Sequence, residues 1–342
     1  MEVDVKVLVD EFYSKPFYLS YSGLNKLLYS PGLFYRWYVL QQQEDKLESY
    51  LIEGKVIHCM LLDDLSFSKH FILMPSALPG DSTRKAVDTV FKAYEVGKVN
   101  LVDYKNEMLN YLKEINLHQS LKDDLKANKD GKTLTGDEKR LEKVMTPDAV
   151  SYWEFLKIKG NKDLVDSDTM QICTEAVEAI RADSRARELL GLDVTEMDNI
   201  QIINEKMLYL ETDKAFGVKG ILDNVKLDHD KKIIYVNDLK RTSKPLGEFR
   251  DTIETYNYWA QASIYVRLVY FEYQELIAAG YTVVFHFVVI DRYNQVYCFA
   301  VSDETMATWQ QRLEGKLNEA NWHYENKSFK LPYEFAVGNI IL

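Results

Sequence analysis

The spacing of apolar residues changes character near residue 199. Before it, apolar side chains recur at helical intervals, as in Leu24, Leu27 and Leu28, and Ser20 supplies a hydroxyl cap ahead of them. After it, β-branched residues dominate short runs that polar turns separate, which predicts strands. We therefore expect an α/β (α+β) fold, in which a large helical amino-terminal part precedes a mixed central sheet flanked by helices.

The predicted elements of the second half follow the order β-β-β-α-β-β-α. Strands are expected over 200–210, 216–227 and 233–240, a long helix over 247–279, a hairpin over 283–301, and a final helix from the cap Asp303 to Leu317. Further helices are expected over 54–62 and 167–190, and Thr135 to Glu138 forms a capping box within a polar, lysine-rich helical stretch over 85–160.

The length of 342 residues exceeds that of one ordinary domain, about 100–200 residues. We expect one domain over 1–342, made of a helical amino-terminal part over 1–75, a helical insertion or arm over 85–195, and a sheet–helix core over 199–320. The arm is either a solvated helical structure or a surface that guides a nucleic acid.

Aromatic residues crowd the segment 11–50. They are Phe12, Tyr13, Phe17, Tyr18, Tyr21, Tyr29, Phe34, Tyr35, Trp37, Tyr38 and Tyr50. Most are expected to pack between helices, and the alternative is that some stack on a ligand such as a nucleic-acid base.

Composition narrows the class of protein. The formal net charge of −11 argues against a surface that is basic all over, although a local basic site fits it. The three cysteines, Cys59, Cys173 and Cys298, are too dispersed for a disulfide framework or a CxxC site, which favours a reducing cytoplasm. The apolar run 283–290 is too short to span a bilayer, and the first residues do not form a signal peptide, so we expect a soluble cytoplasmic protein without a membrane partner.

The first hairpin brings two acids together. A turn centred on Asp230 and Lys231 would place Asp223 opposite Asp238, with Cβ atoms about 4.5–5.5 Å apart. Two carboxylates that close repel unless a cation lies between them, and a hard divalent metal fits that need. Lys240 would project from the same face. The alternative is an exposed ladder of salt bridges, and a register slip of one residue would destroy the arrangement.

These residues stand in a longer series of motifs. Gly217-Val-Lys-Gly-Ile-Leu-Asp223, Asp238-Leu-Lys240 and the later Gln261-Ala-Ser-Ile-Tyr265 resemble the GxxD, (D/E)xK and QxxxY series of the PD-(D/E)XK nuclease superfamily. The resemblance implies a restriction-endonuclease-like core. The sequence departs from the common pattern by having Asp238 where many relatives have Glu, and Leu222 where the name-giving motif has Pro.

The amino-terminal half narrows the resemblance. Its segments 19–31 and 53–63 are similar to the S-x-S-x-L…SP and G-x-x-x-H-x-x-L-L segments of exodeoxyribonuclease VIII (RecE-type) exonucleases of phages and prophages. The similarity covers most of 19–75 and 200–270, and between them only general helical character agrees. Members with an iron–sulfur cluster need four cysteine ligands, so no such cluster is expected here.

The resemblance implies roles for single residues. Asp223 and Asp238 match the metal-binding acids, Lys240 the catalytic lysine, and His58 the histidine that completes the metal site together with the Leu239 carbonyl. A histidine on the apolar face of a helix is otherwise a core residue.

Other residues would act around this centre. Gln261 and Tyr265 share a helix face that contacts the DNA strand in the family, or they form a polar edge packed on the sheet. Arg241 and Lys244 would make the rim of the site basic. Glu205, on the preceding strand, is either a supporting acid or an ordinary exposed glutamate.

The resemblance implies a Mg²⁺-dependent deoxyribonuclease, with Mn²⁺ as an alternative ion, that digests one strand from double-stranded DNA ends for recombination. It also implies a ring-shaped homo-oligomer, a single-strand annealing recombinase as partner, and the bacterial host cytoplasm if the gene belongs to a phage or prophage. The alternatives are another nuclease of the superfamily, such as an endonuclease or a single-strand-specific RecB-like enzyme, and a non-catalytic DNA-end-binding scaffold. The intact Asp223, Asp238 and Lys240 argue against the scaffold.

Overall fold

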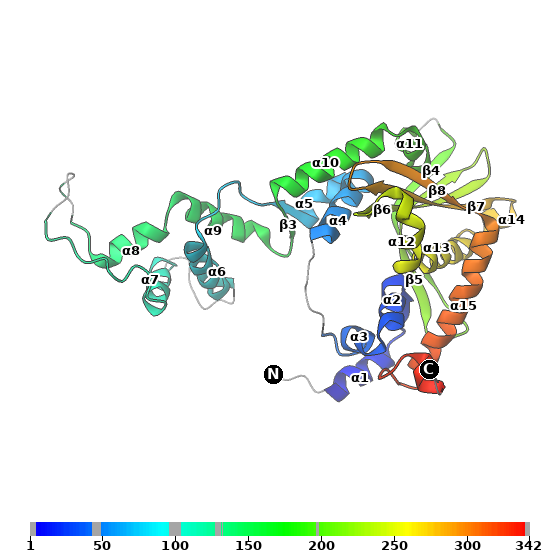
Figure 1. The fold of residues 1–342 in the computed structure, drawn as a ribbon, viewed down its shortest axis with the longest axis horizontal. Coiled ribbons are helices and arrows are strands. Elements are labelled where there is room, and N and C mark those ends of the chain that lie inside the picture. The colour runs from blue at the N-terminus through cyan, green and yellow to red at the C-terminus, as the bar shows by residue number, and fades with distance from the viewer. Residues whose placement is uncertain are drawn as a thin grey trace. The chain divides into compact units, whose positions relative to one another are not determined.

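A computed structural model of the chain describes residues 5–42, 49–95, 104–126, 131, 133–195 and 198–338. They form two compact units (Figure 1). The sheet unit comprises Met1–Phe67 and Gln171–Leu342, and the second unit comprises Ser68–Met170. The predicted arm over 85–195 is therefore divided between the two units. The ring of Tyr50 lies outside the described side chains.

The sheet unit holds most of the helices and all strands of the main sheet. Its first part contains α1 (Val5–Ser14), β1 (Tyr18–Ser20), α2 (Tyr21–Tyr29), α3 (Pro31–Phe34), a π-helical turn (Tyr35–Val39), α4 (Ser49–Leu62) and a 3-10 turn (Asp64–Ser66). Its second part contains most of α10 (Ser167–Ala182), then α11 (Ser184–Leu190), β4 (Ile200–Leu210), β5 (Gly217–Asp228), β6 (Ile233–Thr242), a 3-10 turn (Leu246–Glu248), α12 (Phe249–Thr255), α13 (Tyr258–Glu272), α14 (Gln274–Ala278), β7 (Thr282–Asp291), β8 (Val296–Val301), α15 (Asp303–Glu325) and α16 (Tyr333–Val337).

The main sheet is mixed, as predicted, and has the order β1-β5-β6-β7-β8, with β4 paired to β5. Strands β4, β5 and β6 are antiparallel, β6 and β7 are parallel, and β7 and β8 form the predicted hairpin. Because β4 pairs with β5 along nearly its whole length, β1 and β6 must share the other edge of β5. Strand β1 occupies that edge at 217–219 and β6 at 224–228, so neither strand pairs with 220–223.

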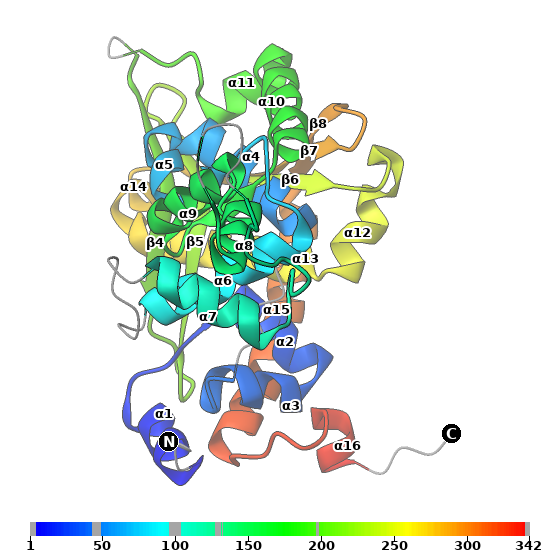
Figure 2. The same cartoon turned by 90° about the vertical axis from the view of Figure 1, so that its left-hand side faces the viewer.

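Helices cover both faces of this sheet (Figures 1 and 2). On one face α13 packs across β4 to β7 and contacts α15, and Trp259, Ile264 and Leu268 of α13 are buried there. Helix α11 and the end of α4 contact the other face. The described amino-terminal aromatics that contact one another, such as Phe17, Phe34 and Tyr38, pack around Tyr324 and Phe329, so the packing interpretation holds for them.

The second unit has its own core. Its elements are α5 (Phe67–His70) at the boundary, β2 (Phe71–Leu73), α6 (Asp81–Glu95), α7 (Tyr104–Glu114), α8 (Gly136–Val144), α9 (Pro147–Lys159) and β3 (Asp163–Val165), where β2 and β3 pair in parallel. The predicted capping box is present, because Thr135 Oγ1 accepts from the Glu138 amide and the Glu138 carboxylate accepts from the Thr135 amide.

Three predicted helix limits were wrong. The helix predicted over 167–190 breaks at Asp183, whose carboxylate caps α11 by accepting from the Ala186 amide. The helix predicted over 247–279 is interrupted at Asn257, which has a left-handed φ of 55°. The cap of α15 is Ser302 instead of Asp303, and that helix continues to Glu325. At Asp183 and Ser302 the side chain bonds to the backbone of the helix that follows and sets where that helix begins. At Asn257 the side chain bonds instead to the Asn25 side chain on α2. None of the described helices has the length and apolar character that a membrane crossing requires.

A row of asparagines ties the sheet to the helices behind it. Asn204, Asn224 and Asn237 lie side by side on β4, β5 and β6. Asn237 Nδ2 donates to Asn224 Oδ1 and Asn224 Nδ2 donates to Asn204 Oδ1, both at 2.8 Å. The row also donates to the carbonyls of Leu62 at the end of α4 and of Leu189 and Leu190 at the end of α11. The side-chain amides thus satisfy carbonyls that helix ends leave without partners. We call these three residues the asparagine row.

His286 lies on β7 beside this row and is buried, at 2% exposure, and no described group bonds its Nδ1. Burial, together with the charges of Arg185 and Lys226, lowers the pKa of His286 from 6.5 to about 4. The unfolded chain therefore binds a proton at His286 more readily than the folded state does. The contribution of His286 to the free energy of unfolding is fully present above pH 6.5 and is lost as the pH drops toward 4.

We expect His286→Gln to remove part of this acid sensitivity, because glutamine does not titrate in that range. The measurement is the free energy of unfolding by urea at several pH values from 7 to 4. An identical decline in the wild type and in His286→Gln would contradict the assignment.

Gly220 lets α13 approach β5. A Cβ atom at this position would lie 2.7 Å from Cε1 of Tyr265 and 3.1 Å from Cδ1 of Leu268, and both side chains are buried. We expect Gly220→Ala to reduce the free energy of unfolding by about 1–3 kcal/mol, because neither side chain can move aside freely. The matched control is Gly315→Ala in α15, where a Cβ atom would contact nothing within 4 Å, so it should stabilise the protein by about 0.5–1 kcal/mol. Equal effects of the two substitutions in urea unfolding would reject the packing argument.

Candidate metal centre

The predicted register of the β5–β6 hairpin is confirmed. Asn224 pairs with Asn237 and Asp228 with Ile233, which centres the connecting turn on Asp230 and Lys231. The ladder ends at the Asn224–Asn237 pair. Asp223 and Asp238 are the next residues on the two strands and lie where the strands begin to separate.

Side chains take over from backbone pairing at this point. The Leu239 amide donates to Asp223 Oδ2 at 2.8 Å, in place of a backbone carbonyl of β5. His58, on α4, fits between the two: Nε2 donates to the Leu239 carbonyl at 2.9 Å, and Nδ1 lies 3.7 Å from Asp223 Oδ2. Residues of the two halves of the sequence thus meet at one place, as predicted for His58, Asp223 and Leu239.

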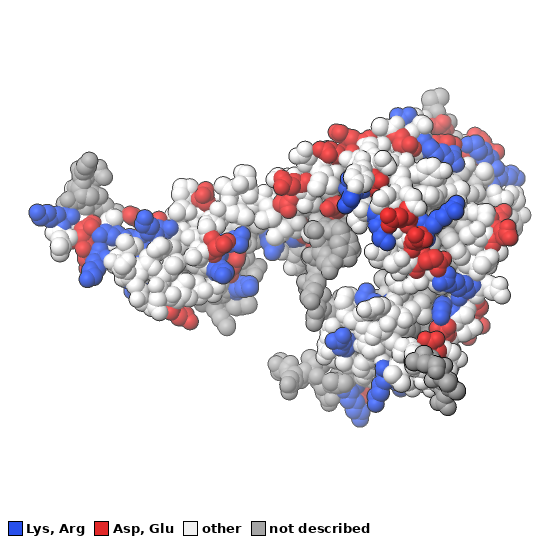
Figure 3. Space-filling model, viewed as in Figure 1, with Lys and Arg blue, Asp and Glu red and all other residues white. Residues whose placement is uncertain are grey.

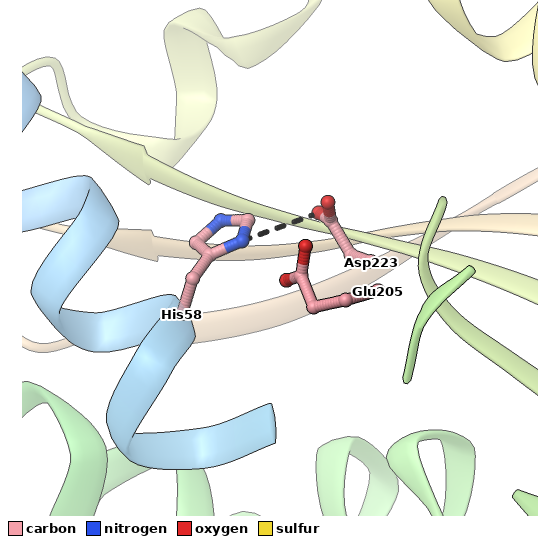
Figure 4. Close-up of side chains that lie close together, drawn as sticks. All are labelled: His58, Glu205 and Asp223. Carbon is pink, nitrogen blue, oxygen red and sulfur yellow. Dashed lines mark ion pairs between the residues drawn. The ribbon is translucent and has the colours of Figure 1, made fainter. Parts of the chain in front are cut away.

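Glu205 completes a group of three potential ligands (Figure 4). One ligand atom from each of His58, Glu205 and Asp223 lies within 4.8 Å of the others. Partial desolvation raises the pKa of Glu205 to about 7, and the Asp223 and Asp63 carboxylates add to this, although the residue as a whole is exposed. Neighbouring carboxylates disfavour the charged form of Glu205, a conflict that a bound cation would remove.

The set of side chains that strand β5 turns toward the core changes at Asp223. The residues that pack into the core are Val218 and Leu222 before it, at even positions, and Val225 and Leu227 after it, at odd positions. A regular strand would keep one parity. The interruption leaves Asp223 at the point where the pattern changes.

Strand β4 changes in the same way opposite this point. Ile203 packs into the core before the change, and Leu208 and Leu210 do so after it. Glu205 lies between them with a left-handed φ of 50°, and it is absent from a ladder that keeps one register on both sides. Such a backbone conformation costs a non-glycine residue about 1 kcal/mol or more, and strain of this kind is concentrated at functional sites.

Asp238 and Lys240 form a buried ion pair beside this group. Lys240 Nζ lies 2.5 Å from Asp238 Oδ2 and 4.8 Å from the centre of the Tyr258 ring. Asp238 is fully buried, and apart from the ion pair its oxygens have no hydrogen-bond partner among the described residues. Burial raises the pKa of Asp238, and the Asp223 charge adds to it while Lys240 opposes it. Burial alone would lower the pKa of Lys240, but the Asp238 and Asp223 carboxylates outweigh it and raise it.

These donors fit a hard divalent cation. Carboxylate oxygens, a backbone carbonyl and one imidazole are ligands that Mg²⁺ and Mn²⁺ accept. Asp238 Oδ1 points to the same conclusion, because it has no partner among the described residues and a buried carboxylate oxygen ordinarily has one. Asp223, Glu205, Asp238, His58 and the Leu239 carbonyl are the residues that would hold such an ion.

Gln261 and Tyr265 are both buried on α13. Gln261 Nε2 donates to the Tyr265 hydroxyl at 3.0 Å, and Gln261 Oε1 has no partner among the described residues. Burial raises the pKa of Tyr265 well above its ordinary value, and the charges of Asp223 and Asp238 contribute. The pair therefore lies near the acids, on the side of the sheet that α13 covers.

A cavity of about 540 Å³, here called the site cavity, opens beside Lys240. Four cations line it, Lys240, Arg241, Lys244 and Arg292, with one carboxylate, Glu53. The Arg241 guanidinium is used within the protein, because it donates to the Asp291 carbonyl and to Glu53 Oε2 at 3.4 Å. A positive lining contrasts with the face in Figure 3, where basic and acidic residues are interleaved.

Sequence reasoning missed several residues around the site. Tyr258, whose ring faces Lys240, stands inside the segment 256–265 and could have been found there. Arg292 reaches the site cavity because β6 and β7 pair in parallel, and Tyr21 reaches it because α2 packs there. No local sequence pattern predicts either contact.

Comparison with models of protein families gives no match, and comparison with curated protein sequences gives none either. Among solved structures, the chain is similar to a protein from Eubacterium rectale that is provisionally described as an exonuclease. The two are 11% identical, the TM-score is 0.46, and the match covers 96% of this chain and 88% of the other. A likeness of this size does not assign a function to the chain.

We expect Mg²⁺ or Mn²⁺ to raise the melting temperature of the wild type, because an ion that binds only the folded state stabilises it. Asp223→Asn should abolish that increase while removing a source of repulsion, so the metal-free variant should melt no lower than the wild type. Calorimetry of both proteins with and without the ion makes the measurement.

The control is Asp230→Asn on the turn of the same hairpin, where the carboxylate accepts from Asn199 Nδ2 at 2.8 Å. It should respond to the ion like the wild type. An undiminished response of Asp223→Asn would remove Asp223 from the metal centre.

Proposed function

We propose that this chain is a metal-dependent deoxyribonuclease that hydrolyses phosphodiester bonds. The observation that carries the proposal is the convergence of Asp223, Asp238 and Lys240 with His58 from α4 beside a cationic cavity. Phosphodiester cleavage needs an activated water, an acceptor for negative charge and a bound phosphate. Each need has a matching group here.

The acids and the histidine would hold one or two divalent ions. Such an ion, when bound, polarises the phosphate and lowers the pKa of a bound water. His58 is held in position for this role by its bond to the Leu239 carbonyl, and Asp223 by its bond from the Leu239 amide.

Lys240 would act on the reacting groups directly. Its ammonium is buried and its charge is secured by Asp238 at 2.5 Å, so it can orient a water and offset negative charge that develops on the phosphate. Lys244 and Arg292 on the wall of the site cavity are the cations that would attract the DNA backbone into an otherwise acidic protein. The family resemblance implies that Gln261 and Tyr265 contact the strand near the cut, and because both are buried on α13, a strand would reach them only from the side of the acids.

The finer proposal is an exonuclease that digests one strand from double-stranded DNA ends for recombination in the cytoplasm. It rests on the RecE-type resemblance of 19–75 and 200–270, which also suggests a single nuclease domain, a ring of subunits and an annealing recombinase as partner. The buried, intact Asp238–Lys240 pair favours an enzyme over a non-catalytic scaffold. An endonuclease of the same superfamily remains the second candidate.

We expect Mg²⁺-dependent digestion of linear duplex DNA, which EDTA stops, and little cutting of covalently closed circles. Lys240→Met removes the ammonium and should reduce the rate of DNA digestion by about 100-fold or more, because the ammonium stabilises charge that forms only during the reaction. Gel analysis of both DNA forms measures the two effects.

Lys231→Met is the matched control, since Lys231 is an exposed lysine of the same hairpin that pairs with Asp228. It should digest DNA at the wild-type rate. Nicking of closed circles as fast as linear DNA would favour the endonuclease, and binding of ends without any cleavage would favour the scaffold.

A further inference from the structure

A second cavity of about 700 Å³ adjoins the site cavity. Helix α2, the α12–α13 junction, α15 and α16 line it, and Tyr21 and Tyr256 line both cavities. The Tyr21 hydroxyl donates to the Tyr256 carbonyl, so these two residues fix the corner that the cavities share. The volume lies within the range of about 300–1,000 Å³ that is typical of ligand sites.

The helix break at Asn257 creates an aromatic path around this corner. Asn257 Nδ2 donates to Asn25 Oδ1 at 2.6 Å, which fastens the left-handed turn to α2. The turn leaves the Tyr256 ring 48% exposed and stacked on the Tyr258 ring, with centroids 5.6 Å apart. Tyr258 in turn faces Lys240. Two adjacent rings therefore connect the proposed catalytic lysine to the second cavity.

Lys26 is the cation of the second cavity that no ion pair among the described residues engages, and Glu334 is a second carboxylate of the lining besides Glu319. The other two cations of the lining are paired, Arg312 with Glu254 at 2.7 Å and Lys316 with Glu319 at 2.7 Å. Lys26 is half-buried over the Trp37 ring at 4.2 Å, and no ion pair joins it to a carboxylate of the described residues. Burial lowers the pKa of Lys26, a cost that a bound anion would reverse.

We propose that the second cavity binds single-stranded nucleic acid, with a base stacked on Tyr256 and a phosphate on Lys26. This inference rests on the proposed function in one respect: the bound strand is the continuation of the strand that is cut beside Lys240. The ring of Tyr29, which is 83% exposed on the cavity wall, offers a further stacking surface.

The chemistry favours a single strand over a duplex. Bases can stack on protein rings only when they have left their own stack, and this stacking is tolerant of sequence. A single lysine can bind one backbone phosphate as a point charge, without the bidentate geometry of an arginine. The site would thus hold the strand by its backbone and its ring faces, without selecting bases.

The test is the affinity for a fluorescein-labelled oligothymidylate, measured by anisotropy in EDTA so that cleavage plays no part. Lys26→Met and Tyr256→Ala should each raise Kd by about tenfold, in line with the energy of a stacked base or a phosphate contact. Lys26→Met should also reduce the slope of log K against log salt by about 0.7, the value for one phosphate contact of a single strand, and Tyr256→Ala should leave the slope unchanged.

Two matched controls lie outside both cavities. Lys327 also rests on a ring, that of Tyr13 at 4.6 Å, and Tyr270 has the same 48% exposure as Tyr256. Lys327→Met and Tyr270→Ala should bind like the wild type. Wild-type affinity in both cavity variants, or equal losses in the controls, would overturn the proposal.

A second measurement separates this inference from the proposed function. The p-nitrophenyl ester of thymidine 5′-monophosphate, a small phosphodiester, reports hydrolysis by the wild type at the metal centre. Failure to hydrolyse it with Mg²⁺ or Mn²⁺ would contradict the proposed nuclease activity. The anisotropy results would still decide whether the second cavity binds a single strand.

Discussion

The alignment of β4, β5 and β6 is the constraint on which the rest of the site depends. One register places Asn204, Asn224 and Asn237 in a row, and the same register places an acid beside each of them, Glu205, Asp223 and Asp238. The asparagines bond to one another and to the ends of α4 and α11, which favours this register over a slip of one residue. Satisfied polar bonds on one row thus hold in place acids that would otherwise separate.

The acids work against the stability that the row provides. Burial and mutual charge raise the pKa values of Glu205 and Asp238, so the folded state holds two carboxyl groups that would ionise more easily in water. The left-handed backbone at Glu205 adds a further cost. Buried carboxyl groups and a strained backbone at one place, in a sheet that is otherwise regular, are typical of a functional site.

The sequence predicts these features unevenly, for physical reasons. The β5–β6 register follows from the turn at Asp230 and Lys231, because a hairpin is a local structure whose turn sets its pairing. The parallel β6–β7 pairing and the entry of Arg292 depend on contacts between distant segments, and no local pattern carries them. The helix break at Asn257 depends on a bond to Asn25, over two hundred residues earlier. The change of parity around Asp223 is visible in the sequence, and it is the signal that would have given Glu205 more weight.

The break at Asn257 and the candidate metal centre are parts of one arrangement. A helix that continued through Asn257 would carry the Tyr256 ring away from Tyr258, and the surface between Lys240 and the second cavity would lose its exposed ring. The left-handed turn also orients the Tyr256 carbonyl toward Tyr21 and Asn25 of α2, which joins α2 to the start of α13, the helix that covers the sheet. His58 makes the same kind of connection from α4 to the Leu239 carbonyl. Both halves of the sequence are therefore required to build the candidate site, because each contributes side chains that the other half's backbone holds in position.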